Sequence, residues 1–149
     1  MKDDTAAGAA TAPASSVTGI RRVAFRGYRS LLLAFLLLGA VQIFLAGLGV
    51  FKLDGQELGG TGETAFDPHR NLGYGMGLLA LFILILAVTA RLGARPIALS
   101  AALLLLIGLA QSTLASLGED TPFFGGLHAA DGLLILGLAL FLHGSARRR

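Results

Sequence analysis

The sequence predicts an all-α integral membrane protein, built as a bundle of four spanning helices. Of its 149 residues, 54% are hydrophobic and only 14% are charged, and the mean hydropathy is +0.74. Soluble domains carry about 25% charged residues, so this composition favours a membrane protein. The apolar residues form four stretches, each near the ~20 residues that a helix needs to cross ~30 Å of hydrocarbon. They lack strand-like alternation, and helices satisfy their own backbone hydrogen bonds, so helical spans are favoured over a barrel.

The four predicted spans form one domain over residues 30–144. They cover residues 31–51, 70–90, 96–117 and 123–142. Because the links after the second and third spans are short, consecutive spans are expected to lie antiparallel and side by side.

Two of the predicted helices have recognisable first turns. Asp67 followed by Pro68 fits the N-cap and N1 positions of the second span, and Thr121 followed by Pro122 fits the same positions in the fourth. Asp and Thr are favoured at the N-cap, and proline is tolerated at N1. Both helices are therefore expected to start on the same side of the membrane and to run in parallel.

The charges predict the orientation of the bundle. Arginines gather before the first span, between the second and third, and after the fourth: Arg21, Arg22, Arg26, Arg29, Arg91, Arg95, Arg147, Arg148 and Arg149. By the positive-inside rule these segments, and with them both termini, are cytoplasmic. The net charge of +3 and the pI near 10.0 then reflect orientation and attraction to anionic lipid rather than nucleic-acid binding.

The ends of the chain are predicted to be short tails. Residues 1–29 are expected to form a disordered, basic cytoplasmic tail without the apolar region of a signal peptide, and residues 145–149 a basic cytoplasmic tail. The sequence has no cysteine, which excludes disulfides, thiolate metal sites, iron–sulfur clusters and covalently attached c-type haem. Alanine-, glycine- and arginine-rich usage without an organellar targeting signal indicates a bacterial inner membrane.

The chain is interpreted as a helical hairpin repeated twice. One glutamine lies in the outer half of each first helix, Gln42 and Gln111, and one histidine lies near the start of each second helix, His69 and His128. Parallel repeats of this kind are related by an axis along the membrane normal, which brings the histidines to opposite sides of one central cleft. The glutamines are interpreted as interhelical hydrogen-bonding residues rather than as ligands.

Each of these histidines is followed four residues later by a glycine, Gly73 after His69 and Gly132 after His128. Residues i and i+4 share a helix face, so each imidazole is expected one turn above a position with no side chain, where a flat cofactor can approach. Two neutral imidazoles from facing helices bind haem iron in six-coordinate b-type centres. The sequence therefore predicts one non-covalent haem b with His69 and His128 as iron ligands.

Two charged residues complete the predicted site. Arg70, next to His69, is expected to pair with a haem propionate. Asp131 follows His128 by three residues, inside a span where a buried charge costs several kcal/mol, and is expected to point inward. It is predicted either to accept a hydrogen bond from an imidazole or to be protonated and relay protons. His143 has no second histidine at its depth and is interpreted as an interfacial residue.

Other interpretations of these residues stay open. A histidine at headgroup depth is often only an interfacial polar residue, and glycines are common where membrane helices pack closely. Zinc is a rival use of His69, His128, Asp131 and Asp67, although the His-Glu-x-x-His spacing is absent. A small transporter or proton-coupled channel centred on Asp131 is the weaker alternative, because the chain is short and this is its one acid inside a span.

The segment His69-Arg70, followed by Leu72-Gly73, resembles the Glu-x-x-His-Arg segment of heme A synthase, whose eight helices form two four-helix halves with paired histidines on the second and fourth helix of each. From about residue 30 to 144 the chain is similar to one such half, with His128 in the place of the fourth-helix histidine. Phe66 stands where that family has its glutamate, so the resemblance implies a haem protein rather than a haem-oxidising enzyme. The layout is also similar to small bacterial four-helix membrane families of unknown function.

The expected function is therefore electron transfer or haem handling by a membrane-embedded b-type haem protein without a catalytic residue. The alternative is a non-catalytic accessory or assembly subunit that holds no cofactor. The expected partners are the lipid bilayer and either a redox partner or a larger membrane complex, and a homo-oligomer is compatible with the sequence. Nucleic acid is not expected, since no aromatic residues interleave with a basic groove.

Overall fold

The computed structural model describes residues 14–54 and 64–148, and this part of the chain is entirely helical, without a strand. Its elements are α1 (Ala14–Asp54), α2 (Asp67–Thr89), α3 (Ala94–Leu105), the π-helical turn η2 (Leu106–Ala110), α4 (Gln111–Asp120) and α5 (Pro122–Arg147). The elements α3, η2 and α4 form one continuous rod. The described residues therefore contain four helices that are long and apolar enough to cross a membrane. The predicted four-helix membrane bundle is confirmed.

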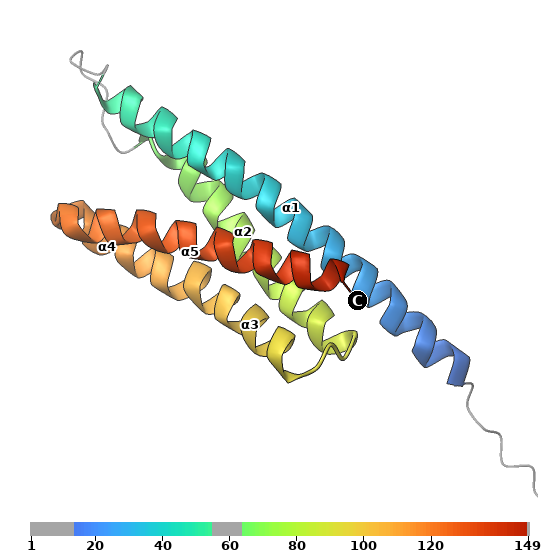
Figure 1. The fold of residues 1–149 in the computed structure, drawn as a ribbon. Helices are drawn as coiled ribbons and strands as arrows, with labels where there is room; N and C mark the ends of the chain where they lie inside the picture. The colour runs from blue at the N-terminus through green and yellow to red at the C-terminus, as the bar shows by residue number, and fades with distance from the viewer. Residues whose placement is uncertain (1–13, 55–63, 149) are drawn as a thin grey trace, which may run out of the picture.

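The rods pack as two antiparallel hairpins, α1 with α2 and α3–η2–α4 with α5 (Figure 1). Further packing of α2 against α3 and of α1 against α5 closes the bundle. One end of the bundle holds the starts of α2 and α5 with His69 and His128, and we call it the histidine end. The other end holds Arg91 and Arg95 with the start of α1 and the end of α5, and we call it the arginine end. The two hairpins diverge toward the histidine end (Figure 1).

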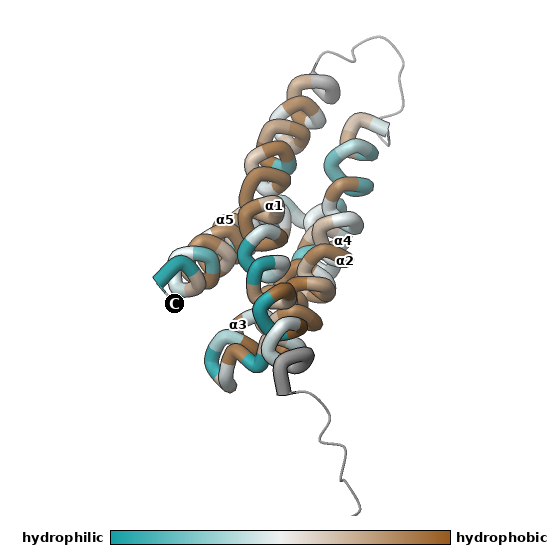
Figure 2. The backbone as a smooth tube through the Cα atoms, turned by 90° about the vertical axis from the view of Figure 1, so that its right-hand side faces the viewer, coloured by the Kyte–Doolittle hydropathy of each residue, from teal (hydrophilic) through white to brown (hydrophobic). Residues whose placement is uncertain are grey.

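The core of the bundle follows a regular spacing of apolar residues. Buried positions recur every three or four residues on α1 (Tyr28, Leu32, Phe35), α2 (Met76, Ala80, Ile83, Ala87) and α5 (Ile135, Ala139, Leu142, Ala146). This is the spacing at which antiparallel helices interlock in bundles. Large apolar residues such as Phe44, Phe82 and Phe141 are instead exposed, as a lipid-facing surface requires. In Figure 2 the middle of each helix is accordingly hydrophobic and the polar residues gather toward the ends.

The structure corrects the predicted tails. Helix α1 begins at Ala14, so the part of residues 1–29 that is described is helical and not disordered. Ala24 and Tyr28 lie in the core, and the Tyr28 hydroxyl hydrogen-bonds the buried Ser100 Oγ at 3.4 Å. At the other terminus α5 continues to Arg147, which removes most of the tail predicted for residues 145–149. The hydropathy pattern did not reveal these helical turns, because arginines stand between their core-facing residues and lower the average hydropathy of the segment.

The helix starts differ in one detail from the prediction. Thr121 is the N-cap of α5 and Pro122 its first residue, as expected, although the Thr121 side chain makes no capping hydrogen bond. The N-cap of α2 is Phe66 rather than Asp67, which is already the first helical residue. A carboxylate in the first turn is still favourable there, because it faces the positive end of the helix dipole.

Candidate functional site

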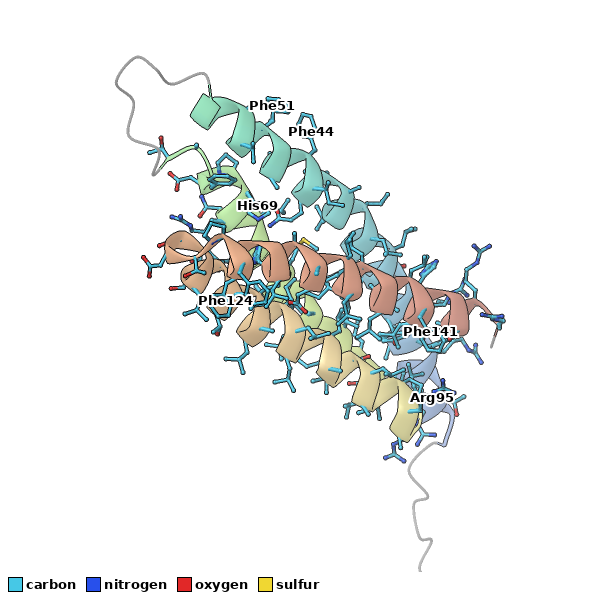
Figure 3. The ribbon with its side chains drawn as sticks, turned by 60° about the vertical axis from the view of Figure 1, so that its left-hand side comes forward. Phe44, Phe51, His69, Arg95, Phe124 and Phe141 are labelled. Atoms are coloured by element: carbon cyan, nitrogen blue, oxygen red, sulfur yellow. The ribbon has the colours of Figure 1, made fainter. Side chains whose placement is uncertain are left out.

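His69 and His128 meet at the histidine end of the bundle. Their ring centroids lie 6.1 Å apart and the ring planes are inclined by 64°. Both residues are half-buried, and they come from α2 and α5, the second helices of the two hairpins. Figure 3 shows His69 between the hairpins, at the opposite end from Arg95. The structure thus brings together the two histidines that the sequence singled out.

Each imidazole is held by a glutamine of the neighbouring helix. The ring Nδ1 of His69 lies 3.1 Å from the backbone carbonyl oxygen of Gln42, and the Nδ1 of His128 lies 3.1 Å from that of Gln111. In return the side-chain amide of each glutamine donates to the backbone carbonyl of its histidine, at 2.7 Å for Gln42 and 3.0 Å for Gln111. The expectation that the glutamines form interhelical hydrogen bonds is confirmed.

These bonds determine which ring nitrogen is free. A backbone carbonyl can only accept a hydrogen bond, so the proton of each neutral imidazole resides on Nδ1. The lone pair is then on Nε2, which keeps it available for a metal or a hydrogen-bond donor. A ring N–H that donates to a backbone carbonyl is the usual support of a metal-ligating histidine. His69 and His128 therefore carry the tautomer that a ligand needs.

Gly73 and Gly132 have a packing role that the sequence did not predict. A Cβ atom at Gly73 would lie 3.2 Å from Gln42 Nε2, and one at Gly132 would lie 3.4 Å from Gln111 Nε2. In an α-helix the carbonyl of residue i faces the N–H of residue i+4, so a missing side chain at i+4 opens that carbonyl to a second donor. The glycines make room for the glutamine amides to reach the histidine carbonyls. That they also let a flat cofactor approach the helices stays a prediction.

The glutamine helices carry a matching pattern that the sequence prediction overlooked. Four residues after Gln42 and Gln111 stand Ala46 and Ala115, whose small side chains leave the glutamine carbonyl open in the same way. Residues 39–49 and 108–118 also agree more widely. They are identical at six positions: Gly39/Gly108, Gln42/Gln111, Leu45/Leu114, Ala46/Ala115, Leu48/Leu117 and Gly49/Gly118. The similarity of these two segments is a signal in the sequence that Gln42 and Gln111 have equivalent roles, each beside the histidine of its own hairpin.

The last glycine of each segment packs tightly against a residue from the other half of its hairpin. A Cβ at Gly49 would lie 2.5 Å from the Phe66 ring, which also packs edge-on against His69 at 6.4 Å. A Cβ at Gly118 would lie 2.9 Å from the backbone nitrogen of Gly125. Both partners stand three residues before the histidine of their hairpin. The turn η2 ends immediately before Gln111, and such π-helical turns are frequent at functional sites.

Asp131 contacts the site through Gln111. Its carboxyl group lies near the Gln111 side chain, whereas the Nδ1 of each imidazole faces a glutamine carbonyl and not this carboxylate. The proton relay predicted as the other role of Asp131 stays a prediction. Two buried side-chain oxygens near the histidines, Asp131 Oδ2 and Gln42 Oε1, have no hydrogen-bond partner within the described residues. They leave two acceptors for a proton donor at the site.

The other residues of the predicted site lie further out. Arg70 is half-exposed and forms an ion pair with Asp67, N to O 3.6 Å. Three further polar residues of the third rod, Ser112, Thr113 and Ser116, are all exposed. Ser112 donates to the Gly108 carbonyl of its own helix, at 3.2 Å. These three side chains are not part of the site.

The structure brings two possible metal ligands, His69 and His128, into edge-on contact, with ring centroids 6.1 Å apart. Among the described residues no group of three or more His, Asp, Glu or Cys side chains that could hold a metal ion is found.

Comparison with known proteins gives one match. A model of a family of unknown function, DUF6220, matches residues 42–117, about half of the chain. The matched region starts at Gln42, contains His69 and Gln111, and ends before His128. No curated protein matches the chain. No solved structure matches it either.

Proposed function

Because this chain belongs to the DUF6220 family, whose function is unknown, its function has to be inferred from its own side chains, and we propose that it binds one b-type haem between His69 and His128. One observation carries the proposal: the two rings meet from two different helices, each with Nδ1 bonded to a backbone carbonyl, and Nε2 of each has no hydrogen-bond partner among the described residues. An incidental interfacial histidine needs neither the repetition nor the support.

Two histidine ligands favour electron transfer over oxygen chemistry. A haem held by His69 and His128 would supply one-electron transfer rather than oxygen chemistry. The protein's part is to hold the two imidazoles in one tautomer and at one separation, through the carbonyls of Gln42 and Gln111. Rigid ligands of this kind keep the reorganisation energy of electron transfer small.

The histidine end also offers charge for the group, and the two hairpins diverge toward it (Figure 1). Arg70 is exposed one residue from His69 and can exchange its ion pair with Asp67 for a haem propionate. Gln42 Oε1 and Asp131 Oδ2 add two acceptors for ordered water at the rim.

We further propose that the bundle is one hairpin repeated in tandem and that both termini face the cytoplasm of a bacterial inner membrane. The six shared residues of the two glutamine segments and the two equivalent glutamine–histidine pairs support the repeat. The orientation is supported by eight arginines at the arginine end: Arg21, Arg22, Arg26, Arg29, Arg91, Arg95, Arg147 and Arg148. The described carboxylates lie at or toward the histidine end.

The similarity to half of a heme A synthase remains a proposal that rests on His69-Arg70 and on the place of His128. Phe66, at the position of that family's glutamate, packs against the His69 ring and brings no acid to the site. Electron transfer or haem handling therefore suits these residues better than oxidation of the haem itself. A redox partner, a larger membrane complex or a second copy of the chain would then receive the electron or the haem.

A second candidate function is a cofactor-free accessory or assembly subunit. The edge-on contact of His69 with His128 favours it, because this contact joins the two hairpins without any metal. In this case the histidines and glutamines act as interhelical hydrogen-bonding and packing residues, each contact worth about 1 kcal/mol. The two functions differ in whether the protein holds haem.

Haem stoichiometry separates the two candidates. The full chain is produced in a bacterial host supplied with a haem precursor, purified in mild detergent, and its haem is quantified as the pyridine complex. The proposed function predicts one haem b per chain, released without covalent attachment. A purified, folded chain that holds none, and takes up none when haem is added, would leave the accessory-subunit function.

A further inference from the structure

A cavity of about 170 Å³ lies at the arginine end, far from the histidines. Its walls come from three helices: Phe25 and Tyr28 of α1, Arg95 and Leu99 of α3, and Leu142 and Ser145 of α5 are among them. The cavity is smaller than the pockets of about 300–1,000 Å³ that take whole small-molecule ligands. It has room for one compact polar group with an apolar surrounding.

The charge around this cavity is of one sign. Arg95 lines it, and seven further arginines of the described residues lie at the same end of the bundle. The carboxylates whose side chains are described, Asp67, Glu119, Asp120 and Asp131, lie at the histidine end or along α5 toward it. None of the described carboxylates is therefore a neighbour of Arg95. Its guanidinium lies over the Phe141 ring instead, 5.5 Å from the centroid (Figure 3).

The start of α3 adds to this positive field. The helix begins at Ala94 with Gly93 as its N-cap, so no side chain caps its first N–H groups. Those groups and the helix dipole favour an anion at a helix start. Arg95 and the next residue, Pro96, both line the cavity, so this helix start lies beside it.

The turn before α3 holds a further arginine, Arg91, in an unfavourable backbone conformation. Arg91 has φ of 52°, in the left-handed region, and it closes α2 with hydrogen bonds from Arg91 N to Val88 O and from Leu92 N to Ala87 O. This position of a helix C-terminus strongly favours glycine. Arg91 therefore adds a positive charge to this end of the bundle despite the strained backbone.

We propose that the cavity binds the phosphate group of an anionic phospholipid, with Arg95 as its main cation and Ser145 as a hydroxyl partner. The apolar walls formed by residues such as Phe25, Leu99 and Leu142 suit the glycerol and the first methylenes of the acyl chains. A freely soluble phosphate would gain nothing from these walls. Arginine binds phosphate oxygens in a two-pronged geometry, and basic pockets between membrane helices commonly hold lipid headgroups.

Native mass spectrometry of the detergent-purified full chain tests the proposal. The probes are phosphatidylglycerol and phosphatidylcholine with the same acyl chains. The wild type should retain one phosphatidylglycerol in preference to phosphatidylcholine, and Arg95→Gln should lose about fivefold or more of that affinity. The matched control is Arg22→Gln, which removes an exposed arginine of the same end that does not line the cavity. It should change the affinity less than about twofold.

A second variant tests the cavity without removing a charge. Ala146 is 5% exposed and lines the cavity, so Ala146→Leu fills it and should abolish the preference for phosphatidylglycerol while the helical circular dichroism is kept. Ser145→Leu replaces it if that variant does not fold. Equal losses in Arg95→Gln and Arg22→Gln would overturn the proposal, because they indicate diffuse surface attraction. Displacement of the lipid by millimolar inorganic phosphate would also overturn it, in favour of a soluble anion.

Discussion

Gln42 and His69 hold each other by two hydrogen bonds, each from one side chain to the backbone carbonyl of the other residue, at 2.7 and 3.1 Å. Gln111 and His128 repeat the arrangement at 3.0 and 3.1 Å. Because both acceptors are backbone carbonyls, a side-chain substitution removes only one bond of each pair. The bond that fixes the histidine tautomer therefore survives the loss of the glutamine side chain.

This arrangement predicts that Gln42→Leu lowers the stability of the protein but does not abolish haem ligation. The variant loses the bond from Gln42 Nε2 to the His69 carbonyl, and the free energy of unfolding in mixed micelles should fall by about 1 kcal/mol. The bond from His69 Nδ1 to the residue-42 carbonyl remains, so haem ligation by His69 should persist with a weakened affinity. Urea or dodecyl sulfate titration followed by circular dichroism measures the first effect, and haem titration measures the second.

The control for this experiment is Ser112→Ala. Ser112 is an exposed polar residue that bonds only to the carbonyl of Gly108 in its own helix, so its loss should leave both quantities almost unchanged. If Gln42→Leu is as stable as Ser112→Ala, the reciprocal bonds do not join the hairpin, and the account of the site fails at its first step.

Gly73→Ala tests the role assigned to the glycine after each histidine. The added Cβ would lie 3.2 Å from Gln42 Nε2 and push the amide away from the His69 carbonyl. We expect a loss of stability of roughly 0.5–1.5 kcal/mol, against the gain that alanine normally brings to a helix. Gly75→Ala and Gly77→Ala are matched controls on the same helix, since a Cβ at either position meets nothing within 4 Å. Equal melting temperatures for all three variants would refute the role.

Gly118→Ala should disturb the turn between α4 and α5. A Cβ at Gly118 would lie 2.9 Å from the backbone nitrogen of Gly125, which cannot move aside as a flexible side chain can. Overpacking of this kind costs about 1–3 kcal/mol. Gly125→Ala, on the other helix of the same turn, has open space at its Cβ and should be tolerated. Thermal unfolding of the two purified variants gives the comparison, and a Gly118→Ala variant as stable as Gly125→Ala would contradict the close approach.

The sequence predicted the spans well because length and hydropathy are what a bilayer selects. It did not predict that α1 begins at Ala14, because hydropathy averages over all faces of a helix. Arg22, Arg26 and Arg29 lower that average, whereas Ala24 and Tyr28, on another face, are buried in the core. Helix continuity here follows from one packed face, which a window average cannot register.

The site was predicted only in part for a related reason. The spacing of His69 and Gly73 shows that they share a helix face, but it does not show which neighbour lies on that face. The structure puts Gln42 there. The partner of His128 Nδ1 was missed for the same reason, since the carbonyl of Gln111 comes from another helix.

The absence of native cysteines makes the proposed orientation directly testable. Single-cysteine variants Glu119→Cys, at the histidine end, and Arg147→Cys, at the arginine end, are treated in intact bacteria with a membrane-impermeant maleimide. Cytoplasmic termini predict labelling of Glu119→Cys alone, and of both variants after the membrane is opened. The unmodified chain, without a cysteine, is the background control. Labelling of Arg147→Cys in intact cells would reverse the orientation.

The central claim is that His69 and His128 hold one haem. The most direct measurement is the reduced-minus-oxidised absorption spectrum of the purified full chain, recorded for the wild type and for His69→Ala, His128→Ala and His143→Ala. The account predicts a sharp low-spin α-band that is lost in the first two variants and kept in His143→Ala, because His143 lies 15 residues beyond His128 on α5. A spectrum unchanged by loss of His69 or His128, or a wild type without an α-band after haem reconstitution, would contradict it.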